Sequence, residues 1–199
     1  MENLTLWYDW LLVGMAVTAL IVFVALHFID AGYGIMYSRR WGASVNNRLG
    51  WVIMESPVFF AMLALWLCSP RRAETAPLVM ALLFELHYFQ RSFIFPLLIK
   101  GKSRMPLSII LMGVTFNLIN AVMQGGWIFY ISPADRYPDS WLLSPQFIGG
   151  TLIFFAGMAI NIHSDYIIRH LRKPGDTRHY LPRGGMFRYV SSANYFGEV

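Results

Sequence analysis

Long stretches without a charged side chain constrain the fold of this chain more than any other feature. Three of them extend over residues 10–29, 105–134 and 140–164, and none contains Asp, Glu, Lys or Arg. Each has roughly 20 residues or more, enough for a helix to cross a hydrocarbon core of about 30 Å. Two further apolar stretches contain one or two charges each. We therefore predict five spanning helices, near residues 8–29, 50–68, 77–99, 106–131 and 143–164.

The composition supports a membrane protein and excludes other classes. Hydrophobic residues make up 56% of the 199 residues and charged residues only 14%, against about 25% charged in soluble domains. So few charges exclude a disordered chain or a nucleic-acid-binding arm. The single cysteine, Cys68, excludes an internal disulfide and a cysteine-rich metal site. The apolar runs are too long for the strands of a membrane barrel. The expected fold class is an all-α integral membrane protein, a multi-span helical bundle.

The basic residues predict how this bundle lies in its membrane. If the N-terminus is outside, twelve of the 16 Lys and Arg residues fall in the inner loops and the tail, and only Arg71, Arg72 and Arg136 fall outside. The positive-inside rule therefore places the N-terminus outside and the tail in the cytoplasm. Residues 165–188 are polar, basic and contain several Pro and Gly, so we expect a structured cytoplasmic loop. Residues 189–199 become apolar again, and there we expect the start of a further helix.

Polar residues at membrane depth are the first candidates for function, because they are costly there unless they are paired. Glu55 lies about one turn inside the second predicted span, and Pro57 follows it. A proline inside a helix removes a backbone donor and loosens the helix locally. Two interpretations of Glu55 remain open. It is either a carboxylate that pairs with a neighbouring helix or a functional proton donor.

Two further predicted spans carry polar faces. Glu85, Tyr88 and Ser92 share one face of the third span by their spacing, and Arg91 lies on the same side. The Tyr88 hydroxyl is deep enough to need a partner, which in a purely structural role is Glu85 or a backbone carbonyl. One face of the fourth span carries three amides, which we interpret as hydrogen-bonding groups between helices: Asn117, Asn120 and Gln124.

The densest polar cluster begins where the fifth span leaves the membrane. Four residues form one stripe by helical spacing: Asn161, Asp165, Arg169 and Arg172. An interfacial helix whose basic side chains reach back to water would also give such a stripe, but Asn and Asp at this depth suit the recognition of amides and ribose hydroxyls. The run from His163 to Asp165 is not a hydrolase triad, because adjacent helical residues point about 100° apart. No Gly-rich fingerprint of a Rossmann fold or Walker motif is present.

Several short segments of the tail occur in a fixed order. They are NIHSDYIIR at 161–169, LRKPG at 171–175, PRGGMF at 182–187, YV at 189–190 and ANYFGE at 193–198. Together with HYF at 87–89 and the helix of Glu55, this ordered set resembles the steroid 5α-reductase (3-oxo-5α-steroid 4-dehydrogenase) family. The resemblance extends from about residue 50 to the last residue.

The resemblance implies an NADPH-dependent membrane enzyme that reduces the C4–C5 double bond of a 3-oxo-Δ4-steroid to a 5α-dihydro product. It implies that hydride goes to C5 and that the catalytic residues Glu55 and Tyr88 polarise the C3 carbonyl. The cofactor contacts it implies are Lys102, Asn161, His163, Asp165, Arg172, Asn194 and Glu198. Among the basic residues available for phosphates, namely Arg169, Arg172, Lys173 and Arg178, we favour Arg172, because a planar guanidinium suits phosphate.

The resemblance also implies an overall organisation. The complete family fold has six or seven spans with cytoplasmic cofactor loops, and it continues past the residues printed here with another helix and a His-, Arg- and Tyr-bearing end. We expect one transmembrane catalytic domain over residues 1–199, in a bacterial inner membrane or the endoplasmic reticulum, with its cofactor site facing the cytoplasm. The expected partners are a steroid or sterol-like substrate from the lipid phase and membrane lipid, without metal, nucleic acid or an obligate protein partner.

The sequence departs from the family pattern at two positions, and three other interpretations of its function stay open. Met54 stands where the family has Gln before the catalytic Glu, and His179 where relatives often have Tyr. A related ene-reductase acting on another sterol or an enoyl thioester would share the same catalytic pair. A small proton-coupled transporter would use Glu55, Glu85 and Arg91 as a relay. A third alternative is an inactive fragment.

Overall fold

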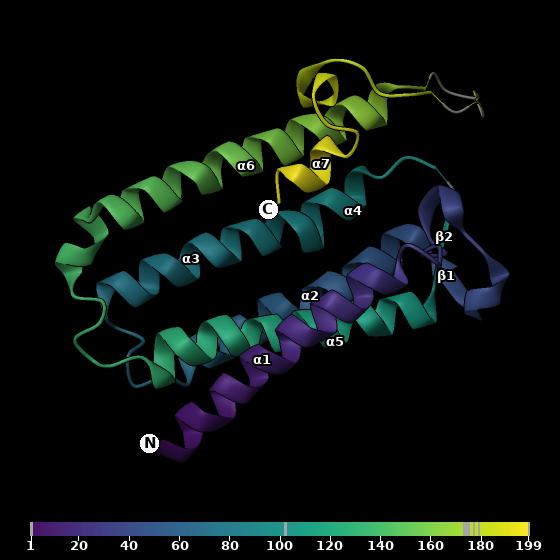
Figure 1. Ribbon diagram of the computed structural model, residues 1–199. Coiled ribbons are helices and arrows are strands. Elements are labelled where there is room, and N and C mark those ends of the chain that lie inside the picture. Colours follow the sequence, from purple (N-terminus) through teal and green to yellow (C-terminus); the bar gives the residue numbers. More distant parts are fainter. Residues whose placement is uncertain (1, 102, 173–175, 177, 179, 199) are drawn as a thin grey trace. The chain divides into compact units, whose positions relative to one another are not determined.

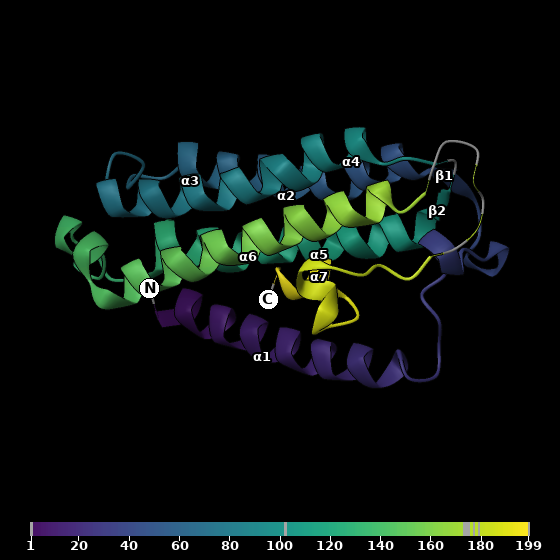
Figure 2. The same cartoon turned by 90° about the horizontal axis from the view of Figure 1, so that it is seen from above.

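The computed structural model describes residues 2–101, 103–172, 176, 178 and 180–198. The chain forms two compact units, residues 1–138 and residues 139–199, and each is described by itself. The elements can be followed in Figures 1 and 2. Our prediction of one catalytic domain over residues 1–199 stays a prediction.

The first unit contains most of the helices. Its elements are α1 (Glu2–Ala25), η1 (Gly34–Met36), η2 (Arg39–Trp41), β1 (Ser44–Asn46), α2 (Asn47–Leu67), α3 (Thr75–Phe89), η3 (Gln90–Ile94), α4 (Phe95–Leu98), β2 (Arg104–Pro106), α5 (Leu107–Gly126) and η4 (Trp127–Ile131). The second unit consists of η5 (Asp139–Leu143), α6 (Pro145–His170), η6 (Gly185–Arg188) and α7 (Ala193–Phe196).

Five helices of the described chain are long and apolar enough to cross a membrane, which confirms the five predicted spans. They are Asn3–Ala25, Asn47–Leu67, Thr75–Leu98, Leu107–Ile131 and Pro145–His170. Two of them differ in extent from the prediction. The first lies several residues earlier, because the polar N-terminal residues join the helix. The last is longer, because the polar stripe that begins at Asn161 continues it without a break. The further helix expected over 189–199 is present only as the single turn α7.

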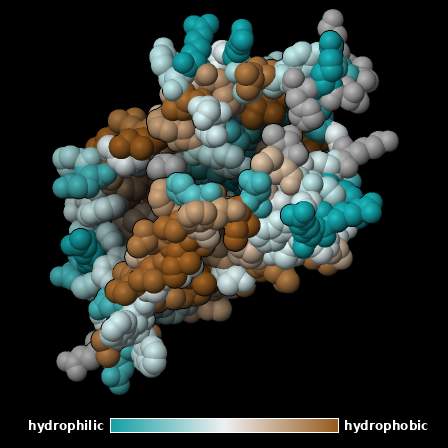
Figure 3. All heavy atoms as spheres, turned by 45° about the vertical axis from the view of Figure 1, so that its right-hand side comes forward, coloured by the Kyte–Doolittle hydropathy of each residue, from teal (hydrophilic) through white to brown (hydrophobic). Residues whose placement is uncertain are grey.

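The surface carries many large apolar side chains, as a lipid-embedded bundle requires. Trp7, Phe28 and Ile153 are each more than 70% exposed. Exposed apolar residues appear as brown areas in Figure 3. In α1 no part of the apolar window is buried within the protein, and its Tyr8 hydroxyl donates to the Met123 carbonyl at 2.8 Å. The burial pattern is therefore that of helices whose outer faces meet lipid.

A two-stranded ribbon that the sequence analysis did not predict precedes two of the spans. β1 pairs with β2 antiparallel, with Val45 opposite Met105. β1 is followed at once by α2, and β2 is followed at once by α5. The ribbon therefore joins the starting points of these two helices.

α2 and α5 run in the same direction and pack closely. An added Cβ at Gly113 would lie 2.4 Å from the Met54 side chain, and one at Gly125 would lie 2.8 Å from Leu65. Positions further along α5 thus meet positions further along α2. Small residues allow this close approach of two helix backbones.

Two buried apolar clusters lie in the first unit. One contains Met62, Ala81 and Phe129, from α2, α3 and η4. The other contains Trp51 and Ile110, from α2 and α5, together with Met105 of β2. In the sequence of α2, Glu55 falls between the residues of these two clusters. The packing therefore places a carboxyl group between two apolar layers.

A π-helical segment interrupts the third span just after Tyr88. In η3 the amide of Phe95 donates to the carbonyl of Gln90, a bond over five residues. Pro96 follows directly and cannot donate a backbone bond of its own. The extra residue per turn breaks the regular α-helical spacing on which the predicted face of Glu85, Tyr88 and Ser92 depended. By contrast, α2 continues through Pro57 without a break.

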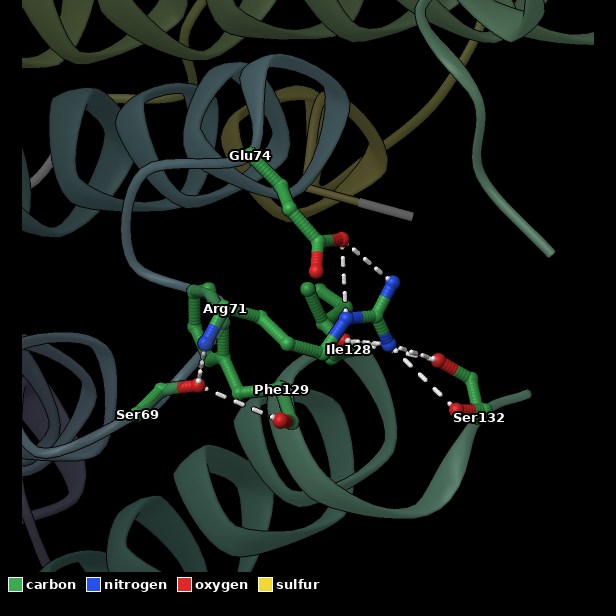
Figure 4. Close-up of polar contacts among 6 residues, drawn as sticks. All are labelled: Ser69, Arg71, Glu74, Ile128, Phe129 and Ser132. Carbon is green, nitrogen blue, oxygen red and sulfur yellow. Dashed lines mark hydrogen bonds and ion pairs between the residues drawn. The ribbon is translucent and has the colours of Figure 1, made fainter. Parts of the chain in front are cut away.

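Arg71, in the connection between α2 and α3, binds the far end of the fourth span. Its guanidinium donates to the Ile128 carbonyl (2.9 Å) and the Ser132 hydroxyl (2.7 Å), and it forms an ion pair with Glu74 (2.9 Å). Figure 4 shows this group pointing at the oxygens of Ile128, in η4, and of Ser132, which directly follows η4. The last carbonyls of a helix have no partner within that helix. Arg71 supplies one, and it is only 9% exposed.

We predict that Arg71→Ala destabilises the first unit. Several buried oxygens lose a charged donor, which costs about 2 kcal/mol and lowers the melting temperature by about 5 °C. The measurement is thermal unfolding of the purified protein in detergent. Arg72→Ala is the control, because Arg72 is exposed and its one guanidinium bond, to Leu67, is long at 3.4 Å. Equal melting temperatures for the two variants would contradict the role of Arg71.

Candidate functional site

Glu55, the candidate catalytic carboxyl, lies deeper in its helix than the sequence indicated. α2 begins at Asn47, where the Asn46 side chain accepts a hydrogen bond from the Arg48 amide and caps the helix. Glu55 is therefore about 12 Å along the axis from the start of α2, instead of about one turn. This depth is close to the middle of the span.

Asn117 of α5 binds this carboxyl. Its Nδ2 donates to Glu55 Oε2 at 3.1 Å and to the backbone carbonyl of Met54 at 2.9 Å. Asn117 is buried, with 5% of its surface exposed. The interhelical hydrogen bonding predicted for this amide is thus present. Its partner is the candidate catalytic residue.

Tyr88, the candidate catalytic phenol, is bound by the same helix. Asn120 Nδ2 donates to the Tyr88 hydroxyl oxygen at 2.8 Å, and Gln124 Nε2 donates to Asn120 Oδ1 at 3.0 Å. The sequence analysis had expected Glu85 or a backbone carbonyl as the partner of Tyr88 and had not named Asn120. One helix, α5, therefore binds both Glu55 and Tyr88, through two amides one turn apart.

Two further ionisable residues of the third span lie in the interior of the first unit. The guanidinium of Arg91 stacks over the rings of Trp51 (5.0 Å) and Phe95 (4.4 Å), and Arg91 is only 6% exposed. Both carboxyl oxygens of Glu85 are buried and have no hydrogen-bond partner within the described part of the chain. Arg91 and Glu85 were candidates for a proton relay, and no ion pair is found between them in the described residues.

In the second unit, three of the predicted cofactor residues meet. Asn161 Nδ2 donates to Glu198 Oε1 (2.8 Å) and to the backbone carbonyl of Asn194 (2.9 Å). The contact depends on two glycines, because an added Cβ at Gly197 would lie 2.5 Å from the Gly157 carbonyl oxygen. Backbone therefore packs against backbone where α7 meets α6, 33 to 37 residues apart in sequence.

The remaining predicted residues of α6 lie along its polar stripe. Asp165 is buried at 5% exposure, beside the fully buried Ser164. An added Cβ at Gly185 would lie 2.8 Å from the His163 ring, so η6 packs on that histidine. Arg172 is exposed just past the end of α6, about 16 Å along the axis from Asn161. The predicted cofactor residues of this unit are therefore spread along α6, with Asn161 and Asp165 buried and Arg172 exposed.

Arg178, one of the candidate phosphate ligands, already has an acidic partner. Its guanidinium donates to both carboxyl oxygens of Asp176 (3.1 and 3.0 Å), and the Tyr180 hydroxyl donates to the same carboxyl (2.6 Å). The bonds from Arg178 and then from Tyr180 hold the pKa of Asp176 well below its usual value. The guanidinium of Arg178 is thus paired with an acidic group, whereas no ion pair of Arg172 is found among the described residues, although its charge also acts on Asp176.

The first unit has a basic cavity of about 560 Å³ beside the ribbon. It is lined by Tyr37, Arg39, Gly42, Ser44 and Arg104. Lys102, a predicted cofactor contact from the adjoining loop, lies outside the described residues, as does His179. No group of three potential metal ligands occurs among the residues that the structure describes.

The fold and these clusters define a membrane-type helical protein in which one helix binds a partly buried carboxyl and a partly buried phenol. Comparison with known proteins then gives the family. Residues 103–199 match the family model described as 3-oxo-5-alpha-steroid 4-dehydrogenase. The chain is 38% identical to 3-oxo-5-alpha-steroid 4-dehydrogenase 1 of Bos taurus, over 90% of this chain and 70% of the relative. It is 38% identical to 3-oxo-5-alpha-steroid 4-dehydrogenase 2 of Homo sapiens, over 93% and 71%.

The chain therefore belongs to the steroid 5α-reductase family, as the ordered segments predicted. By that membership it is an oxidoreductase. The matches span about 70% of the length of these relatives.

The sequence analysis identified the polar residues of the candidate site but not the side chains that they contact. It identified the amides of the fourth span by their spacing but assigned them to no catalytic group. It did not identify Gly157 and Gly197 as a contact. The only local signal for that contact was a glycine within the segment that carries Asn194 and Glu198.

We predict that Gly197→Ala separates α7 from α6. The added methyl group would meet backbone atoms at about 2.5 Å, which real contacts do not allow, so the segment must move and the bonds from Asn161 must break. Hydrogen exchange of residues 189–198 should become at least about tenfold faster, the equivalent of 1.4 kcal/mol. Gly150→Ala is the control, because nothing lies within 4 Å of its added Cβ. Unchanged exchange in Gly197→Ala would refute the close packing.

Proposed function

We propose that this protein reduces the C4–C5 double bond of a 3-oxo-Δ4-steroid with NADPH, giving a 5α-dihydro product. The relatives it matches are named as 3-oxo-5-alpha-steroid 4-dehydrogenases. The observation that carries the proposal is the link from one helix to both Glu55 and Tyr88. A carboxyl and a phenol close together in an apolar bundle suit the binding of one carbonyl oxygen.

The chemistry requires negative charge on the C3 oxygen to be stabilised as hydride adds to C5. Hydrogen-bond donors placed before the reaction lower this barrier most effectively where water is excluded. Tyr88 donates in its neutral form. Glu55 donates when its carboxyl is protonated. Both side chains are partly buried between the helices of the first unit. Their role is to bind and polarise the ketone, and the proton that C4 receives is assigned to neither.

The donor set of the second unit fits a dinucleotide. Asn161 and Glu198 offer an amide and a carboxylate, groups that recognise carboxamides and ribose hydroxyls. Arg172 offers a planar cation for phosphate. The buried hydroxyl of Ser164 has no hydrogen-bond partner within the described residues, as expected of a group that a ligand completes. NADPH, when bound, supplies the hydride, and the residues of this unit bind and orient it.

The proposed membrane orientation is compatible with a substrate that reaches Glu55 and Tyr88 from the lipid. With the N-terminus outside, α2 and α5 begin at the cytoplasmic surface. Asn117 lies ten residues into α5, about 15 Å along the axis, a depth similar to that of Glu55. Tyr88 lies ten residues before the end of the third span at Leu98, at about the same depth. An apolar substrate entering from the lipid would meet both groups in the inner half of the bilayer.

The test of this function is turnover. Protein in lipid vesicles is supplied with NADPH and a 3-oxo-Δ4-steroid, and the product and its C5 stereochemistry are identified by mass spectrometry against standards. A parallel panel contains other sterol enones and an enoyl thioester. Formation of the 5α-dihydro steroid is expected. Reduction of a panel member alone would replace the steroid by that substrate, and no NADPH oxidation with any substrate would refute the proposal.

We predict that Glu55→Gln and Tyr88→Phe each lower kcat at least about 100-fold, because each removes a donor used in the transition state. NADPH affinity, measured by fluorescence titration, should change less than about threefold, since these residues bind the ketone and not the cofactor. Tyr130→Phe is the matched control, because the Tyr130 hydroxyl lies away from this pair and donates to the Leu65 carbonyl at 2.9 Å. Loss of NADPH binding in both variants would contradict this division of roles.

A further inference from the structure

The polar face of α5 extends across two neighbouring helices. Asn117, Asn120 and Gln124 are spaced by three and four residues, so they lie along one side of α5. Asn117 reaches α2, Asn120 reaches α3, and Gln124 binds back to Asn120. Each of the two catalytic candidates therefore has its own amide donor from a third helix.

The orientation of the Asn117 amide is determined by a backbone group. The carbonyl of Met54 can only accept a hydrogen bond, so the side of Asn117 that faces it must be the NH₂ group. The second proton of the same NH₂ group goes to Glu55 Oε2. Oε2 is therefore an acceptor, and a protonated Glu55 carries its proton on Oε1. Asn117 thus determines which oxygen of the carboxyl donates.

Asn120 determines the direction of the Tyr88 proton in a similar way. Gln124 donates to the oxygen of Asn120, which leaves the NH₂ group of Asn120 to donate to Tyr88. A hydroxyl that accepts from an amide directs its own proton away from that amide. Accepting a bond also makes the O–H group a stronger donor, because successive hydrogen bonds polarise one another.

We propose that Asn117 and Asn120 are positioning residues that select the proton-donating atoms of Glu55 and Tyr88 for one carbonyl oxygen. The proposal rests on the function proposed above and deepens it. The amides do not touch the substrate. They orient the two donors before the ketone arrives, so the chain does not have to reorganise them during the reaction.

The alternative is that the amides only connect helices. In that case replacing either one lowers stability, and the chemical nature of the replacement matters little. If the amides orient protons, the replacement matters greatly. Leucine removes the donor from Tyr88 but accepts nothing. Aspartate, when ionised, is an acceptor and draws the Tyr88 proton toward itself, away from the substrate.

The experiment compares Asn120→Leu with Asn120→Asp in steroid reduction in vesicles. For Asn120→Leu we expect kcat to fall about tenfold, the effect of one lost hydrogen bond. For Asn120→Asp we expect a fall of about 100-fold at neutral pH, because the phenol proton is misdirected. The activity of the aspartate variant should rise as the pH is lowered, since the introduced carboxyl becomes a donor again once it is protonated. The leucine variant should show no such rise.

The carboxyl is tested with one variant of Asn117, and one control and one further test variant complete the experiment. Asn117→Leu should lower kcat about tenfold with little change in KM, because only the orientation of a donor is lost. Thr115→Val should leave kcat unchanged, since the Thr115 hydroxyl binds its own helix at Leu111. If the variants at Asn117 and Asn120 do not fold, Gln124→Leu tests the proposal. Gln124 is exposed, and we expect its loss to lower kcat about threefold, about half the effect of one hydrogen bond on a logarithmic scale.

Several outcomes would overturn the proposal. Equal kcat for Asn120→Leu and Asn120→Asp at every pH, with only the melting temperature lowered, would assign the amides a structural role. So would an unchanged kcat in Gln124→Leu when the buried variants do not fold. Wild-type protein that reduces no steroid but binds NADPH would refute the proposed substrate and this inference together. Wild-type turnover with fully active amide variants would refute the inference alone.

Discussion

The hydrogen bond between Asn117 and the Glu55 carboxyl is the interaction on which the arrangement of this protein depends. Polar groups are costly to leave unpaired in an apolar bundle, so a packing that separated Asn117 from Glu55 would be unfavourable. The bond therefore favours one packing of α5 against α2, and it does so at the depth where the candidate site lies. The neighbouring hydrogen bond from Asn120 to Tyr88 attaches α3 to the same face of α5. In this protein the contacts that define the fold and those that orient the site are the same.

The two compact units carry different chemistry. The first holds partly buried groups able to donate to a ketone, and it exposes many large apolar side chains. The second combines the Asn161–Glu198 contact with exposed cations such as Arg172. An apolar substrate and a charged cofactor need such different surroundings. The proposed reductase would take its apolar substrate from lipid and its charged cofactor from water, which accounts for the different chemistry of the two units.

The sequence predicted the features that depend on a single segment of the chain. It did not predict those that depend on contacts between segments. Long apolar stretches with few or no charges identified the five spans, because crossing a membrane is a property of one segment by itself. Its charge at membrane depth identified Glu55, and helical spacing identified the faces of Tyr88 and of the amides, because these too are properties of one segment. The ribbon of β1 and β2 was missed, because three-residue strands show no alternation that periodicity can detect. The π turn at η3 and the contact of Gly157 with Gly197 were missed as well, since both depend on packing between distant segments. The roles of the site residues stay predictions.

Attachment of α2 to α5 at both ends limits how this chain can vary in length. The ribbon joins their beginnings, and Arg71 joins the connection after α2 to the end of the fourth span. An inserted or deleted residue between these attachments would turn every later side chain of α5 by about 100°. The amides would then point to lipid while both ends still held. Between Leu107 and Asn117 the chain therefore accommodates exchanges of side chains but no change in the number of residues.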